Sequence, residues 1–238
     1  MRSLISVNSA HAQQYRHEFK YICDEMQLAI IQARIQPLLR LDSHVGQQGF
    51  YQIRSLYFDD PYDSCYLENE NGTDPREKFR IRIYDADASR ISLELKRKEK
   101  GKTLKLSCLL TQEQCRALMR GEILPEGPAY PQVLQKLLTL MKTKHYQPKV
   151  IVEYTRVPYV YPIGNVRVTL DKNISSSAEI SGFLNPEIPL RPILETGKHV
   201  LEVKYDELLP DYIYNLLQLP LLRQTAFSKY YLCRKYSL

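Results

Sequence analysis

The segment from Glu77 to Asp85, "EKFRIRIYD", alternates between polar and apolar side chains at nearly every residue. A period of two is typical of a β-strand, because successive side chains point to opposite faces of a sheet. One face of this strand would be apolar and could pack on a core. The other face would carry three cations in a row, Lys78, Arg80 and Arg82.

Similar apolar patterns recur along the whole chain. They predict strands at 14–23, 51–59, 78–85, 90–98, 102–110, 149–157, 165–172 and 198–205. The strands 78–85 and 90–98 would be antiparallel neighbours joined through "DADAS". About eight meandering strands often close on themselves. We therefore predict a β-rich α+β fold, a closed antiparallel tunnel-type β-barrel with flanking helices.

Four helices are predicted between and after these strands, at 24–41, 111–120, 131–144 and from about 210 to before Pro220. Asp24 would be the N-cap of the first helix, and Leu28, Ile31, Ile35, Leu38 and Leu39 would form its apolar face. Thr111 and Gln114 fit a capping box at the start of the second helix.

The length of 238 residues fits one large domain or two small ones. The chain contains no repeat, no low-complexity linker and no apolar window long enough to cross a bilayer. The short apolar run before residue 10 does not reach the length of a secretory signal. We predict a mobile tail at 1–14 and a single domain at 15–238.

The net charge of +6 is concentrated in one segment. Residues 76–105 hold 11 basic and 5 acidic residues, whereas the rest of the chain holds 22 of each. Such a distribution indicates a binding site rather than a generally basic surface. The five cysteines form no CxxC pair and the five histidines have no metal-ligand spacing. This pattern is typical of a protein of the reducing cytoplasm.

Cations also occur at alternate positions on the other predicted strands, with a few glutamates beside them. Arg80 and Arg82 would stand about 7 Å apart on one face. At an effective dielectric constant near 20, they would repel each other by roughly 2 kcal/mol. Water and salt could offset this repulsion, and so could a polyanion, for which arginine and lysine are suitable phosphate ligands. A barrel lined in this way would be a phosphate-binding tunnel, with its glutamates holding a divalent metal ion.

Several segments together resemble the VTC domain. They are "EFKY" (18–21), "IRSLYFDD" (53–60), "KFRIRIYD" (78–85), "LELKRK" (93–98), "VEYTR" (152–156), "RVTLD" (167–171), "LEVKYDELLP" (201–210) and "FSKYYL" (227–232). The VTC domain is the polyphosphate polymerase domain of the vacuolar transporter chaperone complex and has bacterial single-domain relatives. It belongs to the triphosphate tunnel metalloenzymes, also called the CYTH-like superfamily. The resemblance extends from about Tyr15 to Tyr236 and implies a tunnel of about eight strands.

The resemblance implies a role for individual positions. The residues expected to hold phosphate and drive catalysis are Lys20, Arg80, Arg82, Lys96 and Lys204. Further phosphate or nucleotide ligands are expected at Lys105, Arg156, Arg167, Ser228 and Lys229. Glu202 matches the metal-binding glutamate of the family, and Glu18, Glu94 and Glu153 are weaker candidates. Arg54 is added from the strand phase alone.

Two positions depart from the superfamily pattern. The hydrolytic and cyclase branches begin with ExExK, but the first of these positions is Arg16 in this chain. The glutamate of the pattern is a potential metal ligand, and its absence here favours the polymerase branch over a two-metal triphosphatase. In the strand at 102–110, Lys105 is followed by Leu106 and Ser107, where relatives are usually more basic. One phosphate contact is therefore expected to be missing.

The resemblance implies a cytoplasmic polyphosphate polymerase that uses ATP and Mn²⁺ or Mg²⁺. A separate membrane protein is the partner suggested by analogy, and the oligomeric state stays open. One alternative is an inorganic or nucleoside triphosphatase with the same fold, and another is a non-catalytic polyphosphate-binding module. A nucleic-acid ligand is not expected, because no aromatic stacking platform is evident in the sequence.

Overall fold

The computed structural model describes residues 15–125 and 129–236. The residues of the predicted tail, 1–14, therefore lie outside the described ranges. The strands are β1 (His17–Asp24), β2 (Arg40–Leu41), β3 (Tyr51–Asp59), β4 (Arg76–Tyr84), β5 (Asp87–Glu99), β6 (Lys102–Leu110), β7 (Gln147–Tyr161), β8 (Val166–Ser177), β9 (Arg191–Pro192) and β10 (Lys198–Tyr205). Alternation thus located the eight long strands, with the bounds of β3 and β6 as predicted.

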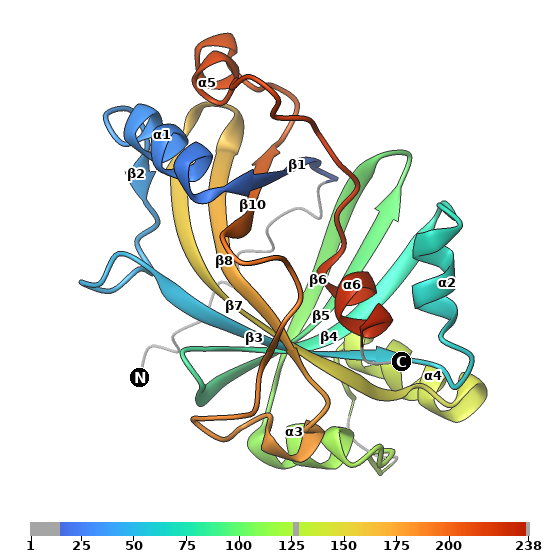
Figure 1. Cartoon of the computed structure of the whole chain (residues 1–238). Helices are drawn as coiled ribbons and strands as arrows, with labels where there is room; N and C mark the ends of the chain where they lie inside the picture. Colours follow the sequence, from blue (N-terminus) through green and yellow to red (C-terminus); the bar gives the residue numbers. More distant parts are fainter. Residues whose placement is uncertain (1–14, 126–128, 237–238) are drawn as a thin grey trace, which may run out of the picture.

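The strands form one antiparallel sheet in the order β1-β10-β8-β7-β3-β4-β5-β6. The short strands β2 and β9 pair with β7 and β8, respectively. The long strands cross one another as the sheet twists and curls (Figure 1). β4 and β5 are joined by Asp85 and Ala86, whose φ angles of 49° and 55° match the two central residues of a type I′ hairpin.

The two edges of the curled sheet meet at a single point. Arg16, just before β1, and Thr103 in β6 each donate a backbone N–H to the other's carbonyl over 2.9 Å. Within the described residues, β1 and β6 share no further strand pairing. The structure therefore shows a curled, barrel-like sheet with one bridge across its seam, and continuous closure is not confirmed.

The α-helices are α1 (Glu25–Ile35), α2 (Ser64–Glu70), α3 (Gln112–Met119), α4 (Gln132–Lys144), α5 (Asp211–Leu216) and α6 (Lys229–Lys235). Short 3₁₀ turns follow at η1 (Ile163–Asn165) and η2 (Ile180–Gly182). The N-cap at Asp24 and the capping box at Thr111 are confirmed, and Asp24 forms a capping box as well. The first helix ends earlier than predicted, because Pro37 has no backbone N–H with which to continue the helical hydrogen bonds beyond Gln36.

Two of the three apolar clusters lie outside the curl of the sheet, between the strands and the helices. α3 and α4 cover the outer faces of β4 and β5, where Phe79, Ile81 and Leu93 are buried. α1 and α5 cover the outer faces of β8 and β10 in a second cluster that includes Leu28 and Leu201. These helices surround the sheet in Figure 1. The inner face carries the cationic side chains together with a third buried cluster that includes Ile53, Val152 and Val200.

One helix differs from the others in position. α6 packs against β7 and β8, and its Tyr230 lies 5.2 Å from the ring of Tyr57, whose hydroxyl contacts Arg80 on the same inner face. α6 therefore occupies one end of the concave surface. None of the helices within residues 15–125 and 129–236 has the length and apolar character that a membrane crossing requires.

Candidate active site

The row of cations that stood out in the sequence lies on the inner face of the curled sheet. In β4 and β5, Arg76 pairs with Lys98 across the ladder, and Lys78 pairs with Lys96. Like charges directly opposite each other destabilise an antiparallel pair. Two consecutive same-face pairs of this kind are therefore suited to an anionic ligand.

These side chains line a cavity of about 350 Å³, the α6 cavity, at the end of the curl where α6 lies. Ten cationic residues line it: Lys20, Arg76, Lys78, Arg80, Arg82, Lys96, Lys98, Arg156, Lys204 and Lys229. Only three acidic residues do so, Glu18, Glu70 and Glu202. The formal excess of seven positive charges makes this cavity a site for a multiply charged anion.

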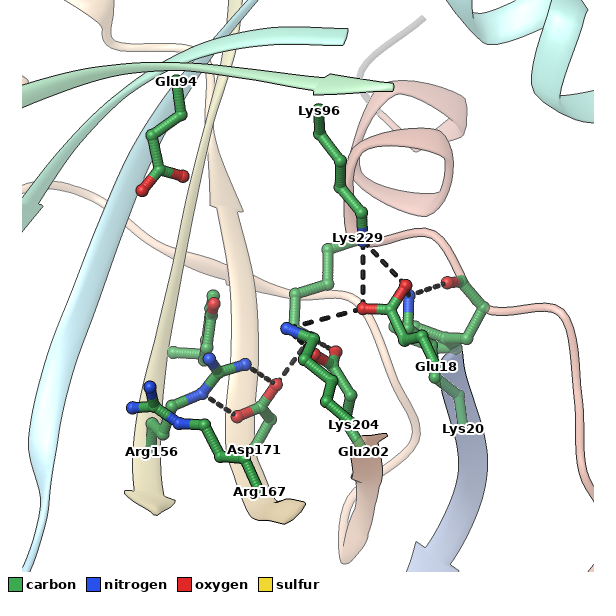
Figure 2. Close-up of polar contacts among 12 residues, drawn as sticks. Glu18, Lys20, Glu94, Lys96, Arg156, Arg167, Asp171, Glu202, Lys204 and Lys229 are labelled. Atoms are coloured by element: carbon green, nitrogen blue, oxygen red, sulfur yellow. Dashed lines mark hydrogen bonds and ion pairs between the residues drawn. The ribbon is translucent and has the colours of Figure 1, made fainter. Parts of the chain in front are cut away.

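Two carboxylates lie among the cations at the β1–β10 side of the cavity. Glu18 accepts hydrogen bonds from Lys96 at 2.8 and 3.0 Å, and Lys204 lies 3.5 Å away (Figure 2). Glu202 is paired with Lys204, and Lys229 lies 3.8 Å from it. Burial acts to raise the pKa of Glu18, but the neighbouring lysines lower it to about 2. Glu202 is likewise held ionised: burial acts to raise its pKa, but the surrounding cations, with Lys204 contributing most, together keep it well below the usual range.

A second group of ion pairs lies deeper, between β7, β8 and α6. Arg156 donates two hydrogen bonds to Asp171, at 2.6 and 2.7 Å (Figure 2). Lys229 reaches the same carboxylate at 2.6 Å and lies over the ring of Tyr154. Asp171 is fully buried, so two cations share one carboxylate. This group retains a positive charge facing the cavity.

The innermost cations of the α6 cavity are those of β4. Arg80 donates to Glu94 at 2.8 Å and to the hydroxyl of Tyr57 at 2.9 Å. Arg82 donates to the hydroxyl groups of Ser55 and Tyr154, at 3.2 and 3.3 Å. Both guanidinium groups are thus held in fixed orientations by buried partners, which is the preorganisation that phosphate binding requires.

Ser228 and Lys229 reach the cavity from α6, a helix that is not among those predicted from the sequence. Ser228 is the N-cap of α6, and its hydroxyl also accepts a hydrogen bond from Lys78 at 3.1 Å. α6 is anchored by Tyr230, which donates to the buried Asp59 at 2.5 Å, and by Arg234, which forms two hydrogen bonds with Asp63. Contacts outside the cavity therefore fix the position of Lys229.

The structure places Arg54 and Glu153 away from both cavities, although Arg54 was predicted as a ligand from the strand phase and Glu153 from the family resemblance. Their side chains bond to each other at 2.5 Å and line neither cavity described here. Arg54 also donates to backbone carbonyl groups of residues 183, 185 and 186. Since the inner face of β3 carries Ser55 and Tyr57, Arg54 must point outward, where this loop satisfies its guanidinium. We do not retain either residue as a phosphate or metal ligand.

Three other predicted residues lie at the opposite end of the curl. Lys105, Arg167 and Glu94 line a second cavity of about 470 Å³, the far cavity. Arg167 pairs with Asp42 at 2.7 Å and donates to Tyr51 at 2.9 Å. The remaining predicted residues line the α6 cavity: Glu18, Lys20, Arg80, Arg82, Lys96, Arg156, Glu202, Lys204, Ser228 and Lys229.

Sequence reasoning missed several residues of the α6 cavity. Lys78, Lys98 and Arg76 share the inner face of β4 and β5 with the predicted cations. The alternation itself could have identified them, because they continue the same rows. Asp171 was also missed as the buried partner of Arg156, since that pairing depends on the register between β7 and β8.

The carboxylates of the α6 cavity fit a divalent metal that is held jointly with a phosphate ligand. Within the described ranges, no group of three or more His, Cys, Asp or Glu side chains is placed to hold an ion. Glu18 and Glu202 nevertheless face the same cavity, and the buried Oε1 of Glu202, which is paired with Lys204, accepts no aligned hydrogen bond. Mg²⁺ usually keeps several waters and binds through one or two carboxylates plus phosphate oxygens, and Mn²⁺ prefers similar oxygen ligands.

Burial and the neighbouring cations lower the pKa of two lysines in the cavity. Burial lowers the pKa of Lys78 to about 7, with Arg76 and Lys20 adding to the effect. Burial also lowers the pKa of Lys96 to about 7, with Lys20 and Lys204 contributing. Each lysine is therefore close to half-protonated near neutral pH, and a bound anion would favour its charged form.

We predict that tripolyphosphate binding at pH 8 takes up protons, because the anion raises the pKa of both lysines. Calorimetry in two buffers of different ionisation enthalpy measures this uptake, and Lys96→Met should reduce it. Equal binding heats in both buffers would contradict the prediction.

The same two lysines make the stability of the free protein depend on pH. Above pH 7 the unfolded chain, with lysine pKa values near 10.5, binds more protons than the folded one, so thermal stability should rise toward pH 10.

Comparison with known proteins places this geometry in context. The family model described as the VTC domain matches residues 15–238. Among solved structures, HpAC1 from Hippeastrum, described as an adenylyl cyclase with a dominant triphosphatase activity, is similar over 94% of this chain and 97% of its own, at 14% identity and a TM-score of 0.53. A protein from Bacillus halodurans, described as an adenylate cyclase, is similar over 87% of both chains, at 14% identity and a TM-score of 0.49. No curated protein matches the chain in sequence. At 14% identity, the likeness to HpAC1 shows a shared fold alone.

Proposed function

Because the chain belongs to the VTC domain family, we propose that it is an ATP-dependent polyphosphate polymerase. It would transfer the γ-phosphoryl group of ATP to the end of an inorganic polyphosphate chain. The observation that carries the proposal is the α6 cavity, whose ten cationic lining residues face only three acidic ones. A pocket with this charge suits a substrate in which every unit carries a phosphate.

The residues of the cavity have separable tasks in this reaction. Arg80 and Arg82 would hold the transferred phosphoryl group and neutralise the charge that develops on it, which is the chief source of catalysis in phosphoryl transfer. Lys20, Lys96 and Lys204 would hold the neighbouring phosphates. The attacking terminal phosphate is already an anion and needs no general base. In agreement, no described residue lining the cavity is a histidine or a cysteine.

Glu18 and Glu202 would hold a Mn²⁺ or Mg²⁺ ion together with the phosphate oxygens. The bound ion would supply charge neutralisation at the phosphate oxygens it bridges. Arg16, which replaces the first glutamate of the hydrolytic pattern, pairs with Asp206 at 2.8 Å and does not line the cavity. The chain thus keeps the second glutamate of the hydrolytic pattern, Glu18, and lacks the first, which supports a polymerase over a two-metal hydrolase.

The proposal is tested by incubating the purified protein with ATP and Mn²⁺ and resolving ADP, free phosphate and polyphosphate in one experiment. We expect ADP to be matched by acid-labile phosphate chains. ADP accompanied only by free phosphate would instead establish a triphosphatase, the activity named in the description of HpAC1. Absence of turnover, with tripolyphosphate still raising the melting temperature, would leave a phosphate-binding module.

A further inference from the structure

One acidic residue of the α6 cavity differs from the other two. The side chains of Glu18 and Glu202 are 8% and 4% exposed and pair with lysines. Glu70, in contrast, is exposed, and no ion pair within residues 15–125 and 129–236 involves its carboxylate, which accepts a hydrogen bond from the hydroxyl of Tyr231 at 3.2 Å. A carboxylate without a cationic partner is unexpected in the lining of so basic a cavity.

Helix stability does not account for Glu70. It is the last residue of α2, where the negative end of the helix dipole disfavours a carboxylate. Other contacts already hold α2 against α6: the rings of Tyr66 and Tyr231 stack at 4.9 Å, and Arg234 donates two hydrogen bonds to Asp63. The two helices stand side by side at this end of the cavity (Figure 1). The fold can therefore dispense with Glu70, and a role in the cavity is the better explanation.

Glu70 lies beyond the cations that would hold the transferred phosphoryl group, on the side toward solvent. Arg82, Arg80 and Lys78 follow one another on the inner face of β4, about 7 Å apart, toward the exposed residues 71–75. Lys78 donates to Asn69 of α2 at 2.9 Å, and Glu70 is the next residue. With the γ-phosphoryl group of ATP at Arg80 and Arg82, its other phosphates would lie along Lys78, and its ribose would reach the end of α2.

We propose that Glu70 recognises the nucleoside part of ATP: its carboxylate accepts a hydrogen bond from a ribose hydroxyl group. This inference rests on the proposed function for the identity of the substrate. An acidic side chain serves the same purpose for the ribose of bound dinucleotides. The carboxylate also repels a phosphate at that position, because both groups are anions. Glu70 thus favours ATP over inorganic tripolyphosphate, although both present three linked phosphates to the cations.

Three ligands test the proposal by calorimetry in the presence of Mn²⁺. They are tripolyphosphate, the β,γ-imido analogue of ATP, which cannot donate its terminal phosphoryl group, and the 2′,3′-dideoxy form of that analogue. The wild-type protein should bind the ATP analogue about tenfold more tightly than the dideoxy form, since a hydrogen bond to a charged group is lost. Glu70→Ala should abolish this difference by weakening the ATP analogue alone. It should bind tripolyphosphate equally or more tightly, because the cavity gains positive charge. Glu70→Gln keeps a neutral acceptor and should give an intermediate ratio.

Glu68→Gln is the matched control, because Glu68 lies on α2 but lines neither cavity. It should leave the ratio between the ATP analogue and the dideoxy form unchanged. Equal binding of these two ligands to the wild-type protein would overturn the role of Glu70 and leave the polymerase proposal intact. Tighter binding of all three ligands by Glu70→Ala would also overturn it, since the carboxylate would then only repel anions. Failure of all three to bind the wild-type protein would overturn the proposed function as well.

Discussion

Arg80→Ala is expected to lower kcat/KM for chain extension by about 100- to 1,000-fold, the typical effect of removing one preorganised donor to a developing charge. Arg80 is nearly buried, and Glu94 and Tyr57 fix its orientation. The lost guanidinium would leave the transferred phosphoryl group with fewer positive contacts in a site of low dielectric constant. Steady-state kinetics with ATP and Mn²⁺ measure the loss.

Two further variants test whether the loss of activity comes from the guanidinium group of Arg80. Arg80→Lys keeps the charge but loses the planar fork, so activity should lie between the two extremes. Arg97→Ala is the matched control, because Arg97 lies on the outer face of β5, pairs with Glu77 and Glu99, and does not line the cavity. Glu94 keeps Arg82 and Lys105 when Arg80 is removed. Thermal melting should therefore change little, and a folded Arg80→Ala protein with normal kcat/KM would refute the assigned role.

Glu202→Gln is expected to reduce kcat by about 100-fold, because charge neutralisation by a bound metal is worth several kcal/mol. The change should affect KM differently. Removing one negative charge beside Lys204 and Lys229 makes the cavity more positive, so KM for ATP should stay the same or fall. The concentration of Mn²⁺ needed for half-maximal rate should rise.

A binding measurement separates this effect from activity. In the wild-type protein, Mn²⁺ should bind weakly alone and tightly when tripolyphosphate is present, since no described group of three or more ligating side chains is placed to hold an ion. Glu202→Gln should weaken the second binding and leave the first nearly unchanged. Glu207→Gln is the control, because its side chain is 70% exposed and pairs only with Lys102 among the described residues. An unaltered Mn²⁺ dependence would remove Glu202 from the metal site.

The long strands could be predicted from the sequence because each has one polar and one apolar face. β4 and β5 alternate cleanly, since their outer residues meet α3 and α4 while their inner residues face the cavity. Alternation indicates only that two faces exist, and neighbouring strands decide which of them is inside. Alternation is therefore sufficient to group the site residues of a strand where every cation of that strand lies on the same face.

Where a strand is covered on both sides, the same reasoning fails. β3 is buried along almost its whole length, and its cation Arg54 points outward to the carbonyl groups of a distant loop. Nothing near residue 54 in the sequence indicates that loop. Lys229 shows a different limit, because four residues, "SKYY", are too few to distinguish a strand from the first turn of α6.

The division of the interior into two cavities also lay beyond the sequence. Glu94, Arg80 and Arg82 lie on adjacent strands, and their pairing depends on the register between β4 and β5. The family resemblance gave Glu94 as a weaker metal candidate. In the structure it lines the far cavity and contacts three cations.

Two of the three apolar clusters lie outside the sheet, and this arrangement affects how such a protein can diversify. Most of the core is formed by the outer residues of the strands and the helices around them, whereas ligand binding depends on the inner residues of the same strands. Inner positions can therefore be exchanged over generations with little disturbance of that outer core. One scaffold can then pass from one phosphate chemistry to another by small steps, each leaving a folded intermediate on which selection can act.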